Sequence, residues 1–481
     1  MNSHANPSAA ARPAAAGRSS TWIALLVAVA FFMENLDGTV ITTAVPQMAA
    51  SFGVQPVDLD IGISAYLLAL GVFIPCSGWV SERLGARTVF TAAMAVFTVS
   101  SLLCGFAQEL SQFVALRVLQ GVGGAMMVPV GRLVVLNSTP KEKLINAIAT
   151  LTWPALVAPV LGPPVGGFIT TYASWRWIFY LNLPIGLAAM AAALALIPND
   201  RAAVRRPFDW PGFLLGGTAL FSLLWAVEQV GGAQAAWGRA ALFFALGAAL
   251  LAGCVVHLRR AANPMIDLSV LKVPTFVVTI AGGSLFRMTV GATAFLLPVM
   301  FQAGFGLDAF HAGLLMIAIF GGNLVIKPAT TPLLRRFGFR RVLLVNGVLN
   351  AAALLTYACM SPATPVPLIA TLLFIGGVSR SIHFTGLNTL AFADVPDNRM
   401  RPANTLFSTA FQLMMGMGVA LGALAARGAH WLNGLTGMDA LPAMDYRLAF
   451  VVLAVLSLLS LADAWRLPPD AGDHVARRRA R

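Results

Sequence analysis

The stretch Phe31-Phe32-Met33-Glu34-Asn35-Leu36-Asp37-Gly38-Thr39-Val40 places two carboxylates inside the first long apolar run of the chain, at about residues 22–44. At ~1.5 Å per residue this run is long enough to cross a ~30 Å hydrocarbon layer. A charge near the centre of a membrane helix costs ~2.5–3.5 kcal/mol, so Glu34 and Asp37 must be either paired or protonated. Their spacing of three places them on one helix face, and both conditions suit a proton carrier.

The composition indicates a polytopic membrane protein. Of the 481 residues, 58% are hydrophobic and 11% are charged, and the mean hydropathy is +0.79. Such values are typical of chains that cross the bilayer many times. Apolar runs continue almost to the C-terminus and leave no stretch large enough for a separate soluble domain. We therefore expect the function to be carried out within the bilayer.

About fourteen apolar runs are expected to form membrane spans. They fall at about residues 22–44, 60–80, 88–108, 111–136, 144–170, 176–197, 210–229, 238–258, 274–302, 310–328, 341–360, 366–391, 403–427 and 446–466. Arginine and lysine gather in alternate connections between them, starting with the N-terminal segment. The positive-inside rule then predicts an even number of spans with both termini in the cytoplasm, and it explains the net charge of +13 better than nucleic-acid binding does.

Two local patterns suggest specialised helices. Residues 155–167 contain prolines and glycines, including Pro159, Gly162, Pro163, Gly166 and Gly167, that predict a kinked helix with a closely packed neighbour. The run could serve packing or act as a hinge. The segment at residues 78–87 also has a faint echo at residues 333–341, as expected for two duplicated transporter halves.

Five segments resemble signatures of the major facilitator superfamily, in order along the first ~190 residues. Gly78–Arg87 is similar to the loop signature of that family, with Glu82 where the family usually has Asp. The others are Leu36–Pro46, with Thr42 in place of Asn, Arg117–Ala125, Gly162–Gly167 and Trp175–Gly186. The fourteen-span count resembles the EmrB/QacA type of drug:proton antiporters.

This resemblance implies an all-α polytopic membrane protein of the major facilitator fold, with two six-helix bundles and two inserted helices. The expected divisions are a disordered cytoplasmic tail at 1–20, an N-terminal bundle at 21–200, the inserted helices at 201–262, a C-terminal bundle at 263–467 and a basic cytoplasmic tail at 468–481.

Proton coupling is expected from Glu34, Asp37 and Arg117. By helix rise, Asp37 and Arg117 reach the same depth in the membrane, so we expect them to face each other, with Glu34 one turn deeper toward the cytoplasm. A substrate entering the cavity would compete for the acid and release its proton. Asp37 could instead be a structural clamp, whereas Glu34 lies outside the family signature and favours proton or cation contact.

The substrate cavity is expected to contain apolar, amide and basic side chains: Phe31, Met33, Gln120, Met127, Arg287, Phe295, Arg380, His383 and Gln412. Arg287 and Arg380 could line the cavity or bond between helices, and His383 could be a core group or a proton relay. The resemblance further implies a conformational latch at Gly78, Glu82, Arg83, Gly85 and Arg87, in which the loop acid caps a helix end.

The sequence therefore predicts a proton-coupled antiporter that exports amphipathic organic compounds or drugs across the bacterial cytoplasmic (inner) membrane by alternating access. The alternative is export of an anionic metabolite, lipid or siderophore-like compound, and a third class is a membrane sensor or scaffold. Expected partners are the small substrate, protons and the lipid bilayer, with the chain monomeric, alone or with a periplasmic adaptor, and no nucleic acid. The sequence contains no Gly-Lys pair, so a phosphate-binding loop is not expected. The four cysteines lack the spacing of metal ligands. We therefore expect no cofactor, no metal and no enzymatic activity.

Overall fold

The computed structural model describes residues 16–139, 144–198, 207–231, 236–396, 399–436, 442–468 and 471, and every regular element in them is a helix. Helix α1 (Ala16–Val40) begins inside the region expected to be a disordered tail. The first fifteen residues and nearly all of the basic C-terminal tail lie outside the described part of the chain.

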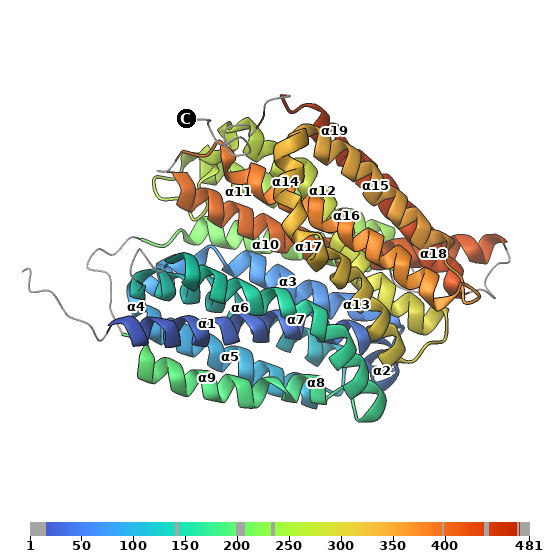
Figure 1. Cartoon of the computed structure of the whole chain (residues 1–481), viewed down its shortest axis with the longest axis horizontal. Helices are drawn as coiled ribbons and strands as arrows, with labels where there is room; N and C mark the ends of the chain where they lie inside the picture. The colour runs from blue at the N-terminus through green and yellow to red at the C-terminus, as the bar shows by residue number, and fades with distance from the viewer. Residues whose placement is uncertain are drawn as a thin grey trace, which may run out of the picture.

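The N-terminal half forms one of two helical bodies, drawn in blue to green in Figure 1. After α1 it contains η1 (Ile41–Thr43), α2 (Val45–Phe52), η2 (Pro56–Leu59), α3 (Asp60–Phe73), α4 (Cys76–Leu84), α5 (Ala86–Phe106), α6 (Leu110–Ser138), α7 (Leu144–Tyr172), α8 (Trp177–Tyr180) and α9 (Asn182–Leu196). Two further helices, α10 (Trp210–Gly231) and α11 (Trp237–Arg260), follow it.

The C-terminal half, in yellow to red, lies against the first half (Figure 1). It contains η4 (Leu268–Lys272), α12 (Pro274–Val299), η5 (Met300–Gly304), α13 (Ala309–Val325), α14 (Lys327–Phe337), α15 (Phe339–Cys359), α16 (Val366–Ala393), α17 (Met400–Thr436), α18 (Pro442–Leu459) and α19 (Leu461–Trp465). Residues 300–304 form a π-helical turn that continues α12 beyond Pro298.

Twelve helices of the described residues are long and apolar enough to cross a membrane, and the bent pair α13 and α14 makes thirteen if it counts as one span. Helix α7 covers the remaining run expected at residues 144–170. The run expected at 60–80 is broken between α3 and α4. Its membrane-crossing part is residues 56–73.

The two halves repeat one helical pattern, which supports the duplication inferred from the sequence. In each half a helix breaks, continues as a short helix and ends at a glycine with positive φ: Gly85 at 90° and Gly338 at 76°. Each glycine is followed by a helix of 21 residues, α5 or α15. A left-handed backbone conformation costs glycine little, which explains why both echo segments keep a glycine at this turn.

The halves meet through glycines of α7 and α13, which lie side by side in Figure 1. A Cβ atom added at Gly167 would collide with the carbonyl oxygen of Ala309, and one added at Gly313 would collide with that of Pro163. Within the N-terminal half, Gly166 approaches Val40 of α1 in the same way. The predicted close packing of the Gly/Pro run is therefore confirmed, and its prolines do not interrupt α7.

The inserted helices are tied to the main body at Asp209, just before α10. Its carboxylate accepts hydrogen bonds from the backbone N–H groups of Gly212 and Met265, each at 3.0 Å, and lies 2.6 Å from Nε2 of His257. Burial raises the pKa of this carboxyl, but the two backbone hydrogen bonds and His257 outweigh burial and bring the pKa below its ordinary value. Asp209 thus joins the start of α10, the end of α11 and the connection to the C-terminal half.

Candidate functional site

Asp37 lies at the centre of a buried polar network between α1, α6 and α9. Oδ2 of Asp37 accepts a hydrogen bond from Nη1 of Arg117 at 2.7 Å, and Oδ1 accepts from Nε2 of Gln120 at 3.0 Å. Nδ2 of Asn182 also donates to Oδ1, at 2.7 Å. The expected pairing of Asp37 with Arg117 is therefore confirmed, and both oxygens of the carboxylate have donors.

The surroundings of Arg117 fix the guanidinium in place. Its side chain is fully buried, and its central carbon lies 4.1 Å from the ring centre of Tyr66, within the range of a cation–π interaction. Nη1 also donates to Oε1 of Gln120 at 2.6 Å. Arg117 and Gln120 are one turn apart on α6, so both can reach the same carboxylate on α1.

Glu34, one turn before Asp37 on α1, has a different environment. The residue is 8% exposed, and Oε2 is buried without a hydrogen-bond partner among the residues that the structure describes. Gly124 of α6 lies beside it, since a Cβ atom there would be in ordinary contact, 3.7 Å from the Glu34 carboxyl carbon. The two acids of α1 are therefore unlike: both oxygens of Asp37 accept hydrogen bonds, whereas Glu34 forms no ion pair with any described residue.

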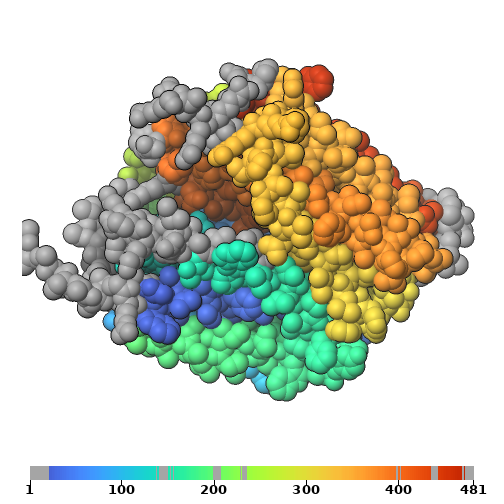
Figure 2. All heavy atoms as spheres, in the orientation of Figure 1, coloured from blue at the N-terminus to red at the C-terminus, as the bar shows by residue number. Residues whose placement is uncertain are grey.

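Glu34 borders a cavity of about 220 Å³ between the two halves. Figure 2 shows a recess between the blue-to-green and yellow-to-red bodies. The cavity is lined by Glu34, Ile74, Ser77, Gly124, Val128, Pro129 and Arg132 of the first half and by Asn404, Thr405, Phe407, Ser408, Phe411 and Gln412 of α17. One acid, one base, two aromatic rings and several amide or hydroxyl groups thus share the space.

Of the nine residues expected in a substrate cavity, Gln412 lines this one, beside Glu34, which was expected to take part in proton coupling. Five others are buried in helix packing: Phe31, Met33, Gln120, Met127 and Phe295 are each 5% exposed or less. None of the five is among the residues that line the cavity. Hydrophobic type and depth in a span could not separate cavity residues from packed ones.

Arg287 and His383 also lie outside this cavity. Arg287 is fully buried and donates through Nη1 to the carbonyl oxygen of Thr279 at 2.9 Å. Its central carbon lies 4.7 Å from the ring centre of Phe407 and 5.7 Å from that of Phe411. His383 is 3% exposed and lies 4.2 Å from the ring of Phe286. Arg287 therefore stands behind two aromatic walls of the cavity and does not reach into it.

Arg380 borders a separate, smaller cavity inside the C-terminal half, with Tyr357, Asn350 and Thr293. None of the residues that line it also lines the 220 Å³ cavity. Of the two roles left open for Arg380, it has the first, because it lines a cavity, but this cavity is not the one that contains Glu34.

The expected capping role of Glu82 is not seen. Glu82 is exposed and makes no hydrogen bond or ion pair with any described residue, and Gly85 at the start of α5 has no side-chain cap. Arg83 lies 5.4 Å from the Trp79 ring, and Arg87 is partly exposed. Gly78 has open space around it, so the turn itself is kept by the positive φ of Gly85.

At the other end of α17, Arg427 joins the halves. Nη2 of Arg427 lies 3.0 Å from Oδ1 of Asp58 and 3.2 Å from Oδ1 of Asp60, and the Asp60 side chain is fully buried. Asn404, in the cavity wall, precedes Arg427 by 23 positions on the same helix, or about 35 Å of helix length. The two halves are therefore joined by ion pairs near one end of α17 and enclose the 220 Å³ cavity near its other end.

Sequence reasoning missed three residues of this region. Asn182 was quoted within a family signature but received no role, although it bonds both Asp37 and, at 2.9 Å, Oγ of Ser101. Ser101 in turn donates to the carbonyl oxygen of Phe179. Arg132 was placed near no site, although its spacing of eight from Gly124 puts both on one face of α6.

Comparison with known proteins identifies the relatives of this chain. Residues 27–419 match the family model described as Major Facilitator Superfamily. The proteins named "Putative multidrug resistance protein MdtD" from Serratia proteamaculans (strain 568) and Klebsiella pneumoniae (strain 342) are both 37% identical to it. The first alignment covers 86% of each chain, and the second covers 96% of this chain and 98% of the relative.

Solved structures share the fold. The crystal structure of a D-xylose-proton symporter matches with a TM-score of 0.67 at 15% identity, over 94% of this chain and 99% of the other. A bacterial homologue of the human lysosomal transporter Spinster, solved in an inward-facing conformation, matches with a TM-score of 0.64 at 14% identity, over 97% and 100%. At such identities these likenesses concern the arrangement of helices and not the substrate.

Proposed function

Since this chain belongs to the major facilitator superfamily and is a multi-pass membrane transporter, we propose that it exports amphipathic organic compounds or drugs across the bacterial cytoplasmic membrane in exchange for protons. The names of its relatives support drug efflux. The observation that carries the proton coupling is the position of Glu34, an unpaired acid on the wall of the 220 Å³ cavity.

Glu34 is the proposed proton carrier. A buried ionised carboxylate without a partner is costly, so the site accommodates the neutral acid unless a cationic group arrives beside it. A substrate with a positive group would displace the proton by pairing with the carboxylate. When the substrate has left on the other side, protonation makes the site neutral again. One acid can then serve the two ions alternately, and this is the exchange that an antiporter requires.

In this proposal Asp37 has a structural role. Its carboxylate is held by Arg117, Gln120 and Asn182, which leaves neither oxygen for a substrate. Helices α1, α6 and α9 are thereby fixed as one body around the proton site. Asp37 is therefore assigned to the clamp and Glu34 to transport.

The two ends of the molecule differ as alternating access requires: one is open at the cavity, and the other is closed by contacts between the halves. The recess at Asn404 is proposed to open to the cytoplasm, because arginine and lysine gather in the connections at that end. The opposite end is held by Arg427 and by the contact of α7 with α13. Breaking these contacts while closing the recess would expose Glu34 to the other side.

The driving force is sufficient for useful extrusion. Moving one proton down a membrane potential of 100 mV releases ~2.3 kcal/mol, and a tenfold concentration ratio corresponds to ~1.4 kcal/mol. One-for-one exchange of a neutral compound would therefore support roughly one to two decades of accumulation outside the cell. For a monovalent cation the exchange is electroneutral, so the pH gradient alone drives it, with about one decade of accumulation per pH unit. No nucleotide is needed for this cycle.

The lining of the cavity favours an amphipathic substrate. Phe407 and Phe411 offer aromatic faces, and Asn404, Gln412 and Ser408 offer hydrogen bonds. Arg132 on the same wall supports a second candidate, export of an anionic metabolite, lipid or siderophore-like compound. Competition between cationic dyes and organic anions for transport distinguishes the two.

The test is made in everted membrane vesicles that carry a preformed pH gradient. Addition of a transported compound should dissipate the gradient in the wild type and in Glu109→Gln, which removes an exposed acid far from the cavity. Glu34→Gln should suppress the response. A response of wild-type size in Glu34→Gln would contradict the assignment, and no response of the wild type to any exported compound would contradict antiport.

A further inference from the structure

Arg380 is a partly buried cation that forms no ion pair with any described residue. It lies near the middle of α16, a span of 28 residues, and its Nε atom is buried without a hydrogen bond. The guanidinium makes no hydrogen bond or ion pair with any described residue, and its neighbours include the rings of Phe320 and Phe384, at 5.8 and 6.0 Å. A guanidinium has five N–H donors, and a charge at this depth in a membrane is costly unless it is compensated.

None of the described acids of the C-terminal half pairs with Arg380 to compensate its positive charge. All of them lie at helix ends or in connections: Asp267, Asp308, Asp394, Asp445 and Asp463. Asp308 pairs with His311, Asp445 with His430, and Asp463 with Arg466. Lys327, at the bend between α13 and α14, adds a second positive charge that interacts with Arg380. The interior of this half is therefore electropositive.

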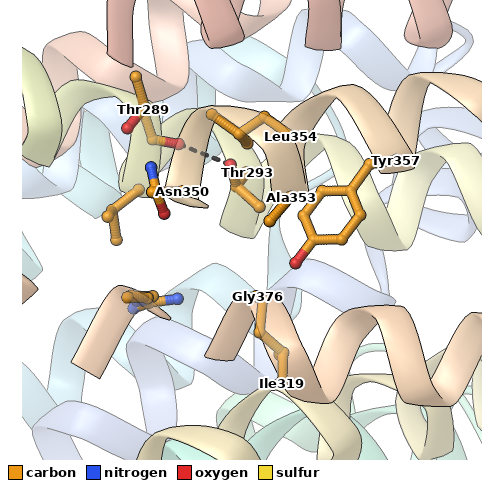
Figure 3. Close-up of a pocket in the computed structure, with 10 residues that line it drawn as sticks. Thr289, Thr293, Ile319, Asn350, Ala353, Leu354, Tyr357 and Gly376 are labelled. Carbon is orange, nitrogen blue, oxygen red and sulfur yellow. Dashed lines mark hydrogen bonds between the residues drawn. The ribbon is translucent and has the colours of Figure 1, made fainter. Parts of the chain in front are cut away.

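A cavity of about 20 Å³ adjoins Arg380. Figure 3 shows Tyr357 of α15, Thr293 of α12 and Asn350 around this space, with the Tyr357 hydroxyl directed toward Gly376. The absence of a side chain at Gly376 is required, because a Cβ atom there would collide with that hydroxyl oxygen. The volume fits one water-sized species and no organic molecule.

The polar groups of the cavity differ in what they can offer. Thr293 donates its hydroxyl proton to the carbonyl oxygen of Thr289, and Nδ2 of Asn350 donates to Oγ of Ser457 at 2.9 Å. Tyr357 makes no hydrogen bond with any described residue, so its hydroxyl remains a donor for the cavity. Arg380 and Tyr357, on different helices, thus provide a charge and a hydroxyl for one small acceptor.

We propose that this cavity binds one halide-sized inorganic anion, chloride under cellular conditions, between Arg380 and Tyr357. The anion compensates the charge of Arg380 and links α16 to α15. This site is separate from the cavity that contains Glu34, so it does not depend on the proposed transport function. Its expected effect is on the stability of the C-terminal half.

The experiment is a thermal unfolding titration of the purified full-length protein in detergent at constant ionic strength. Chloride or bromide replacing gluconate should raise the melting temperature of the wild type in a saturable manner, whereas acetate should not. Arg380→Gln should abolish the shift, and Tyr357→Phe should move the titration midpoint at least threefold to higher chloride. Arg287→Gln, which removes a buried arginine outside this cavity, should keep the response.

Three results would overturn the proposal: equal melting temperatures in all salts, a full chloride shift in Arg380→Gln, or an equal shift with acetate. The first would mean that the cavity holds water only. Should Arg380→Gln fail to fold, the site is tested by Tyr357→Phe and by a crystal grown in bromide. Anomalous scattering from bromide beside Arg380 is expected, and its absence there would refute the site.

Discussion

Nδ2 of Asn182 lies 2.7 Å from Oδ1 of Asp37, on the oxygen that Arg117 does not contact. The same oxygen accepts from Gln120 at 3.0 Å. Donors from α6 and α9 therefore hold both oxygens of an acid on α1. This relationship distinguishes Asp37 from Glu34, three positions earlier on the same helix face.

Asn182→Ala should destabilise the N-terminal half. The substitution removes one of three donors from a buried carboxylate, and losing a hydrogen bond to a charged group costs about 1.5–3 kcal/mol. The melting temperature of the purified protein should fall by several degrees. Asn35→Ala, which removes an amide on α1 that bonds only the carbonyl oxygen of Phe31, should have little effect. Equal stability of Asn182→Ala and the wild type would count against the clamp.

Gly313→Ala should disturb the contact of α13 with α7. Its added methyl group would collide with the backbone carbonyl of Pro163, and backbone cannot move aside as easily as a side chain can. Export of a transported compound and the melting temperature should both fall. Gly321→Ala on the same helix meets open space and provides the matched control. Similar behaviour of the two variants would show that the close approach is not required.

The sequence predicted most of the fold, because long apolar runs are a direct signal of membrane helices. The breaks between α3 and α4 and between α13 and α14 were not predicted, since the apolar runs at 60–80 and 310–328 extend across the break positions. Gly85 and Gly338 carried the only clue, through the similar segments that contain them. In residues 16–20, helix α1 extends into a region whose Gly/Arg/Ser composition suggested disorder.

Arg427→Gln should favour separation of the two halves at the end where Arg427 joins them. The change removes the ion pairs with Asp58 and Asp60, which join α17 to η2 and α3. Spin labels at the exposed positions Ser51 and Ala363, on a background without the four native cysteines, report the separation of the halves at this end. We expect a longer distance population to grow in Arg427→Gln. An unchanged distance distribution would mean that the ion pairs do not hold this end closed.

Asp209→Asn should lower stability in a pH-dependent manner. The hydrogen bonds that lower the pKa of Asp209 contribute stability above its unfolded value of about 3.9, and this contribution is lost as the pH falls through the folded-state value. The difference in melting temperature between wild type and Asp209→Asn should thus be largest near neutral pH and shrink below about pH 4. A difference that grows on acidification would contradict this account.

The candidate site was only partly predictable. The rise per residue of a helix correctly placed Asp37 and Arg117 at the same depth, because the depth of a residue depends on its position along a straight span. It could not reveal which buried residues face the cavity, since that depends on the rotation of each helix in its bundle. Arg287 and Arg380 illustrate this: both lie at mid-span, yet one stands behind Phe407 and the other borders a separate cavity.

Proton release on substrate binding tests the role of Glu34 most directly. Purified protein in weakly buffered detergent solution is mixed with a cationic compound that it exports, and the pH change is recorded with an indicator dye. We expect the wild type and Glu109→Gln to release protons in proportion to the bound compound, and Glu34→Gln to bind without release. Undiminished proton release from Glu34→Gln would contradict the account.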